Sequence, residues 1–228
     1  MRERAALLNL VTELRGRLDE LERMIRTAPN QAIMAPASYD ETGVVDLTPA
    51  EYRSFRATGF DGSRALHRYD PFLGFTQVGA PEGAGDAEVS AFALDELHRL
   101  GPEPAFGLRF QPKDEDNLPW FTYEILTKVD EITQYEWLEW VVKMSFAKPI
   151  KSFVQFIVEG AGFSERIDVG TVPVSDFAAF SHLRLGRSQL MEVAAGRPVR
   201  NIRLTFATGG LPLPMELFGL ALFGRTAG

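Results

Sequence analysis

The sequence predicts a mainly β protein, in which an N-terminal coiled-coil helix precedes an antiparallel, jelly-roll-like β-sandwich with one or two short helices. Aliphatic residues recur in heptad spacing near the N-terminus, and from Pro104 onward hydrophobic and polar residues alternate in segments separated by Gly, Pro or Asp. The 17 Phe far outnumber the 5 Tyr and 3 Trp, which indicates an aromatic, β-rich core. The absence of alternating strands and helices argues against a nucleotide-type α/β fold.

Near the N-terminus, six aliphatic residues alternate in steps of four and three, as in a coiled-coil seam: Leu7, Val11, Leu14, Leu18, Leu21 and Ile25. Arg17 then falls at position g and Glu22 at position e, so that the two meet across the interface of a parallel assembly. The stretch from Arg17 to Glu22 fits the pattern R-h-x-x-h-E and so resembles the trimer-specifying motif of short parallel coiled coils. We therefore expect a homotrimer. A single amphipathic helix packed on its own domain is the alternative.

Composition divides the chain into four segments. Residues 1–28 form the predicted coiled-coil oligomerisation helix, and the small and polar residues 29–47 form a linker arm. Residues 48–103 form a mixed helical and irregular segment packed on the head, and residues 104–228 form the β-sandwich head.

A short helix is expected after Thr48, which can cap it, with Pro49 at the first position and Gly59 at the end. Tyr52 and Phe55 then share one helix face, so that the helix has an apolar side to bury.

The segment Asp86–Leu100 fits a second helix, although a strand is also compatible with it. In the strand that we expect at Glu136–Phe146, Trp140 lies on the inward face, whereas Trp137 and Glu139 lie on the opposite face. The other strands are expected at Ala105–Phe110, Trp120–Val129, Lys151–Val158, Phe177–Leu185, Val199–Thr208 and Pro214–Phe223.

The formal net charge is −7 and no basic run occurs, so a nucleic-acid partner is not expected. The chain has no Cys, which excludes disulfides and thiolate chemistry. No run approaches the roughly 20 apolar residues of a membrane span, and the N-terminus lacks the features of a secretory signal. We expect synthesis in the cytoplasm, with display on a virion or other particle surface, or non-classical export, as destinations.

No motif indicates catalysis. His67, His98 and His182 lack metal-ligand spacing, and no nucleophile elbow, P-loop or dinucleotide fingerprint occurs. The sequence therefore predicts a protein that is not an enzyme and needs no cofactor.

One acidic stretch is a candidate Ca²⁺ site. Asp114, Asp116 and Asn117 form the densest cluster of oxygen ligands, directly before a predicted strand. The spacing and glycine of an EF-hand are absent, which favours a solvated turn whose side chains bond their own backbone.

Trp137 and Trp120 are the candidate ligand-binding aromatics, with Glu139 beside the first. An exposed ring on a rigid sheet stacks on the apolar C–H face of a pyranose, while carboxylates nearby bind its hydroxyl groups. The alternative is that Trp137 packs under a loop or against a neighbouring subunit.

The whole plan, a trimeric rod followed by a β-sandwich, resembles phage and phage-like fibres or spikes, and trimeric lectins. The resemblance implies a non-enzymatic trimeric binding protein whose head contacts a cell-surface or extracellular glycan, with a particle or anchor protein at the N-terminus. Two alternatives stay open: a purely structural or scaffolding oligomer without a sugar ligand, and a cytosolic enzyme with an oligomerising helix.

Overall fold

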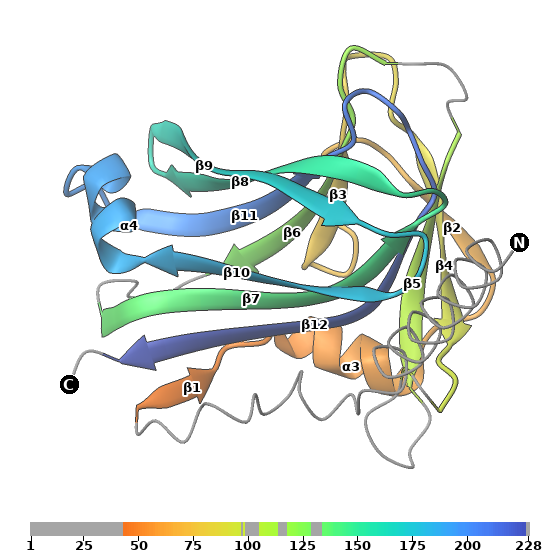
Figure 1. The fold of residues 1–228 in the computed structure, drawn as a ribbon, viewed down its shortest axis with the longest axis horizontal. Helices are drawn as coiled ribbons and strands as arrows, with labels where there is room; N and C mark the ends of the chain where they lie inside the picture. Colours follow the sequence, from red (N-terminus) through yellow and green to blue (C-terminus); the bar gives the residue numbers. More distant parts are fainter. Residues whose placement is uncertain (1–42, 97, 99–104, 114–117, 129–133, 227–228) are drawn as a thin grey trace, which may run out of the picture.

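The computed structural model describes residues 43–96, 98, 105–113, 118–128 and 134–226. Within these ranges two sheets of antiparallel strands face each other (Figure 1). This confirms the predicted sandwich-like, mostly β architecture. The predicted coiled coil, including Arg17 and Glu22, lies outside the described residues, and so does the candidate Ca²⁺ cluster from Asp114 to Asn117.

Sheet A has seven strands and sheet B has five. Sheet A runs in the order β10 (Ala179–Gly186), β7 (Tyr135–Phe146), β12 (Met215–Thr226), β5 (Phe106–Pro112), β4 (Ala87–Ala93) and β2 (Ser63–Leu66), and β1 (Val44–Asp46) also pairs with β12. Sheet B runs in the order β3 (Thr76–Gly79), β6 (Thr122–Lys128), β11 (Val199–Ala207), β8 (Ile150–Gly160) and β9 (Phe163–Val174).

The inward-facing residues of both sheets form one apolar core, because successive strand residues point to opposite faces. Trp140 on β7 is fully buried, as its parity predicts, and its indole N–H donates to Thr127 Oγ1 on β6 at 3.0 Å. The largest other fully buried side chains are Tyr123, Phe75, Phe110, Phe121, Phe146, Phe156 and Phe206.

Helix α3 (Ala50–Thr58) closes one open side of the sandwich, below β12 in Figure 1. Its Tyr52 and Phe55 are buried on one face, as the sequence predicts. The residue before the helix is Pro49, without a side-chain cap, so the expected capping role of Thr48 is wrong. The Thr48 hydroxyl instead accepts the amide of Leu222 on β12 at 3.0 Å.

The segment expected to be a helix at Asp86–Leu100 contains strand β4, which pairs with β5 and β2. Val89, whose apolar side chain the helix would have buried, is fully buried as a strand residue between these partners. Strand β9 and helix α4 (Arg187–Ala194), which lies at the left end of the molecule in Figure 1, are elements that the sequence analysis did not predict.

The sandwich also takes strands from the predicted linker arm and from the predicted mixed segment. Strand β1 pairs with β12. Strands β2 and β4 extend sheet A, and strand β3 forms an edge of sheet B. The sequence allows one or two short strands within Ala65–Val78, and β2 and β3 lie at the two ends of this segment. Strand β1 has three residues, too few for hydrophobic periodicity to reveal it. Neither of the helices in the described ranges is long and apolar enough to cross a membrane.

Candidate functional site

The outer face of sheet B carries a row of polar side chains at its centre. Glu124 on β6 and Thr205 on β11 are direct cross-strand partners, and Gln77 on β3 pairs with Glu124 from the other side. Strand parity that sends Tyr123 and Ile125 into the core sends Glu124 outward. The alternation in the strand predicted at Trp120–Val129 also places Glu124 on the outward side, but Glu124 is only 3% exposed. Its surroundings must therefore satisfy its charge.

Arg203 on β11 lies between two carboxylates. It donates to Glu124 Oε2 at 2.8 Å and to Glu159 Oε1 at 2.7 Å, and its side chain is 16% exposed. Burial alone lowers the pKa of Arg203, but the two carboxylates outweigh this and raise the pKa above its ordinary value. The guanidinium is thus permanently charged, and its hydrogen bonds fix the positions of both carboxylates.

Both oxygens of Glu124 are occupied by donors of the protein. Gln77 Nε2 donates to Oε2 at 2.6 Å, beside the Arg203 bond, and Thr122 Oγ1 donates to Oε1 at 3.0 Å. Glu159 differs, because its side chain is 28% exposed and Arg203 is its one hydrogen-bond partner among the described residues. Glu159 can therefore accept a hydrogen bond from a ligand, whereas the buried Glu124 holds the Arg203 guanidinium in position.

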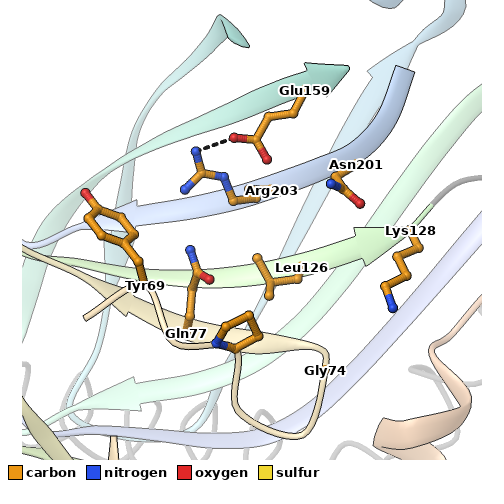
Figure 2. Close-up of a pocket in the computed structure, with 9 residues that line it drawn as sticks. Tyr69, Gly74, Gln77, Leu126, Lys128, Glu159, Asn201 and Arg203 are labelled. Atoms are coloured by element: carbon orange, nitrogen blue, oxygen red, sulfur yellow. Dashed lines mark hydrogen bonds and ion pairs between the residues drawn. The ribbon is translucent and has the colours of Figure 1, made fainter. Parts of the chain in front are cut away.

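A pocket of about 490 Å³ opens over this cluster (Figure 2). In the close-up, Tyr69 and Lys128 lie toward opposite ends, and the Arg203–Glu159 pair lies between them. Lys128, Asn201 and Glu159 are successive cross-strand partners on β6, β11 and β8. The lining residues are Tyr69, Pro71, Gly74, Gln77, Leu126, Lys128, Glu159, Asn201 and Arg203.

Tyr69 forms an aromatic wall of the pocket from a strained backbone. Its φ is 57°, in the left-handed region that costs a non-glycine residue about 1–3 kcal/mol. Its amide donates to Val78 O at 2.8 Å, which ties the loop to β3. Burial and the nearby Glu124 carboxylate raise the pKa of the Tyr69 hydroxyl above its usual range. The phenol is therefore a neutral hydrogen-bonding group at physiological pH.

Gly79 at the end of β3 lets Tyr69 lie close to the sheet. A Cβ at this position would lie 2.8 Å from Glu124 Oε1 and 3.2 Å from Tyr69 Cε1. Both approaches are tighter than ordinary van der Waals contact, so any other residue would displace the ring or the carboxylate.

Trp120, which the sequence singled out, lies beside Tyr69. The two ring centroids are 6.3 Å apart with a tilt of 40°, and the two residues are 39% and 42% exposed. Trp120 lies two residues before the start of β6, near the loop–strand junction that the sequence predicted. It adds a second exposed ring next to the polar pocket.

Two polar atoms on this face have hydrogen-bonding capacity that the described residues do not use. Arg203 Nε and Thr205 Oγ1 are both buried without a partner. Buried polar groups in folded proteins are nearly always paired, so such exceptions are concentrated where water, an ion or a ligand completes the network. Both atoms belong to neighbouring outward positions of the same strand.

Trp137 and Glu139, the other predicted ligand-binding residues, lie on the outer face of sheet A. They form a compact cluster with β10, in which the Arg184 guanidinium lies 4.4 Å from the Trp137 ring centre. The same guanidinium is 3.1 Å from Glu139 Oε2, and His182 Nδ1 is 3.5 Å from Glu139 Oε1. The structure therefore brings Trp137 and Glu139 together but places Trp120 on the other sheet.

The three histidines are separated, as their sequence spacing suggested. Besides His182, His67 lies 3.1 Å from Asp86 and His98 lies 2.6 Å from Asp95. Within the described ranges, no group of three or more His, Cys, Asp or Glu side chains is placed to hold a metal ion.

Most of the pocket is not predicted from the sequence, including Tyr69, Gln77, Glu159, Asn201 and Arg203. These residues come from a loop and three strands, and the hydrogen-bonded pairs that they form with one another or with Glu124 are separated by 44 to 79 positions. The outward parity of Glu124 was the one available signal.

No protein-family model matches the sequence, and no curated protein sequence matches it either. Among solved structures, a Stig cyclase from Fischerella in complex with a pyrrolidinylidene-indole is 7% identical, with 81% of this chain and 100% of that chain covered at a TM-score of 0.50. A family 30 carbohydrate-binding module of a cellulosomal cellulase from Clostridium thermocellum is 15% identical over 70% and 96% of the two chains, with a TM-score of 0.41.

A family 4 carbohydrate-binding module is also similar, with 9% identity over 66% of this chain and 86% of that chain at a TM-score of 0.43. Several further structural neighbours are carbohydrate-binding modules. At these identities the likeness concerns the β-sandwich fold alone.

Proposed function

We propose that this protein is a non-enzymatic glycan-binding protein whose β-sandwich head holds a neutral sugar in the pocket on sheet B. The observation that carries the proposal is the Glu159–Arg203 pair in the pocket, with Asn201 as the cross-strand partner of Glu159. A sugar hydroxyl both donates and accepts hydrogen bonds. Neighbouring carboxylate, guanidinium and amide groups satisfy both capacities.

The charges of the pocket support a neutral ligand. Glu124 and Glu159 contribute two negative charges, and Arg203 and Lys128 contribute two positive charges, so the formal sum is zero. Arg203 already has two carboxylate partners, and an acidic sugar would compete with them for the same guanidinium. Tyr69 supplies the apolar wall on which the C–H face of the ring rests.

The bonding of Glu124 supports binding without catalysis. Most glycoside hydrolases use two carboxyl groups, one as acid and one as base or nucleophile. In this pocket both Glu124 oxygens already accept hydrogen bonds from Arg203, Gln77 and Thr122. That leaves Glu159 as the carboxylate with acceptor capacity toward the pocket.

The predicted coiled coil extends the proposal to a homotrimer that displays three heads, with a virion or particle surface as the proposed location and an anchor protein at the N-terminus. Individual sugar sites are weak, and three linked sites engage a surface together with far greater avidity. Ca²⁺ at Asp114, Asp116 and Asn117, and glycan contact by Trp137 and Glu139, stay predictions from the sequence.

The test is a glycan-array screen of the full-length protein with its oligomeric state measured in the same preparation. We expect neutral glycans to bind, and Glu159→Gln to reduce binding at least about tenfold because a hydrogen bond to a charged acceptor is lost. The matched control is Glu165→Gln, since Glu165 also pairs with an arginine, Arg197 at 3.2 Å, but does not line the pocket.

A protein that binds no glycan on a broad array would favour the structural or scaffolding alternative. Equal losses in Glu159→Gln and Glu165→Gln would place the binding site elsewhere. Trp137→Ala provides the corresponding test for sheet A, because loss of binding in this variant alone would transfer the site to the Trp137–Glu139 cluster.

A further inference from the structure

We infer that the ligand is an oligosaccharide that spans two adjacent subsites, the polar pocket and an aromatic platform formed by Tyr69 and Trp120. This inference rests on the proposed function and specifies the class of glycan. Tyr69 lines the pocket, whereas Trp120 is not among the lining residues. A single ring in the pocket therefore touches Tyr69 but does not reach Trp120.

The two rings are arranged to receive one apolar surface. Their centroids are 6.3 Å apart and their planes are tilted by 40°, and both residues are about two-fifths exposed. Large aromatic side chains at the surface lose the favourable burial that they would gain in a core. Two such rings side by side, next to a polar pocket, form a platform for a second sugar ring of the same chain.

The platform is fixed before any ligand arrives. Tyr69 is held in the left-handed conformation by the hydrogen bond that its backbone N–H donates to Val78 O, and the Asp70 amide donates to His67 O at 3.0 Å in the same loop. Backbone strain of this kind is retained where the surrounding structure determines the position of a side chain. The backbone that precedes Trp120 is also fixed, because the amide of Leu118, two residues earlier, donates to Gly210 O at 2.8 Å.

The close fit at Gly210 keeps Trp120 in place. Gly210 has a φ of 87°, and a Cβ there would lie 3.6 Å from the carbonyl carbon of Pro119 and still closer to the backbone of Leu118. The turn of Gly209 and Gly210 therefore packs directly on the backbone that precedes Trp120. A preformed platform loses little conformational entropy when a sugar chain binds.

The two subsites divide the recognition of the ligand. The pocket supplies the hydrogen-bonding groups of Glu159, Asn201 and Arg203, and so sets which sugar is accepted. The platform supplies mainly apolar contact, and so raises affinity for any neutral ring linked to the first one. Affinity is therefore expected to rise with chain length from one sugar residue to the length that covers Trp120.

The experiment is isothermal titration of the full-length protein with gluco-, manno-, galacto- and xylo-oligosaccharides of graded length, from monosaccharide to pentasaccharide. In the series that binds, we expect affinity to rise at least about tenfold between the monosaccharide and the longest member. Trp120→Ala should remove most of that rise and leave monosaccharide affinity unchanged. Met191→Ala is the control and should retain the full length dependence, because Met191 is an apolar side chain on α4 that is 38% exposed and lies in neither subsite.

The outcomes separate this inference from the proposed function. A monosaccharide that binds as tightly as the pentasaccharide overturns the two-subsite inference and leaves glycan binding in the pocket standing. Loss of monosaccharide affinity in Trp120→Ala, with unchanged thermal unfolding, also overturns it, because Trp120 would then belong to the first subsite. If no sugar of any length binds here or on the array, the proposed function itself fails.

Discussion

Arg203 donates to the buried carboxylate of Glu124 at 2.8 Å, from a strand that lies 79 positions further along the chain. This bond joins β11 to β6 across the outer face of sheet B, and it is part of both the stability of the head and the geometry of the proposed site. Glu124 at 3% exposure needs a cation, and Arg203 in turn holds Glu159 at the pocket surface.

Arg203→Met is expected to destabilise the head by about 3–5 kcal/mol, because it leaves a buried carboxylate without its cation. The measurement is the free energy of unfolding from urea titration. The control is Arg53→Met, since Arg53 and Asp46 form an ion pair at 3.1 Å in which both side chains are about half exposed. That pair should contribute less than about 1 kcal/mol. Equal effects would mean that Glu124 is satisfied without Arg203.

The hydroxyls of Tyr52 and Thr48 replace a neighbouring strand along the middle of β12. Strand β5 pairs with β12 at Met215–Leu217 and β1 pairs with it at residues 223–225, on the same edge. Between these, Leu220 N–H donates to Tyr52 Oη at 2.9 Å and Leu222 N–H donates to Thr48 Oγ1 at 3.0 Å.

Tyr52→Phe should therefore destabilise the protein by about 1–3 kcal/mol, because it leaves the buried Leu220 amide without an acceptor. Hydrogen exchange of the Leu220 amide should accelerate, while that of Val142, its cross-strand partner on β7, should change only with global stability. Unchanged protection of Leu220 in Tyr52→Phe would show that water or another acceptor serves this amide.

Lys143 provides a pH-dependent test on sheet A. It is 4% exposed, and burial is the main cause that lowers its pKa from 10.5 to about 8, with Asp95 raising it and Arg56 lowering it. Between pH 8 and 10.5 the unfolded chain binds more protons at this residue than the folded chain. Its contribution to stability therefore increases as pH rises through this window.

Lys143→Met should remove this contribution and raise the unfolding free energy relative to wild type most strongly below pH 8. The difference between wild type and variant should shrink as pH rises toward 10.5. Lys148→Met, at an exposed turn position, should give a curve parallel to that of wild type. Burial raises the pKa of Tyr123 well above 10.0, so this residue lowers stability as pH rises above that value. Because Tyr123 is present in every variant, its effect cancels when the unfolding free energies of variant and wild type are subtracted at each pH.

The alternation of β6 and β7 was predictable because large apolar residues recur at every second position of their inward faces, interrupted in β6 by Thr127. The same logic fails where the backbone departs from regular pairing. In β12 a bulge between Leu217 and Gly219 changes the parity, so that Leu217 and Leu220 both face the core. Such a shift inverts the face of every following residue, and a simple alternation rule misplaces them.

The candidate site was predictable only in part, for a related reason. Trp120 was identified because it follows Pro119 at a loop–strand junction, where an exposed aromatic ring can stack on a sugar ring. Tyr69 gave no such signal, since its position depends on a left-handed backbone held by Val78. Glu159 and Arg203 meet through the register of β8 and β11, which local sequence patterns do not encode.

The final prediction links the rod to the function of the head. Replacing Leu18 and Leu21 by Asp places charges in the predicted coiled-coil seam, which costs several kcal/mol for each chain and should prevent assembly. Sedimentation at micromolar concentration should then give a monomer, and a monomeric wild type would contradict the coiled coil. The double change Asp19→Asn with Glu20→Gln, at the outward positions b and c, is the control and should remain trimeric.

Because the core of the head is formed by residues of the two sheets, the monomeric variant should keep the affinity of each pocket for a soluble oligosaccharide. Its retention on a surface coated densely with the same oligosaccharide should fall by at least about a hundredfold, since simultaneous engagement of several sites is lost. Equal retention of monomer and trimer would mean that each head acts alone. The rod would then serve attachment of the protein to its anchor rather than avidity for the glycan.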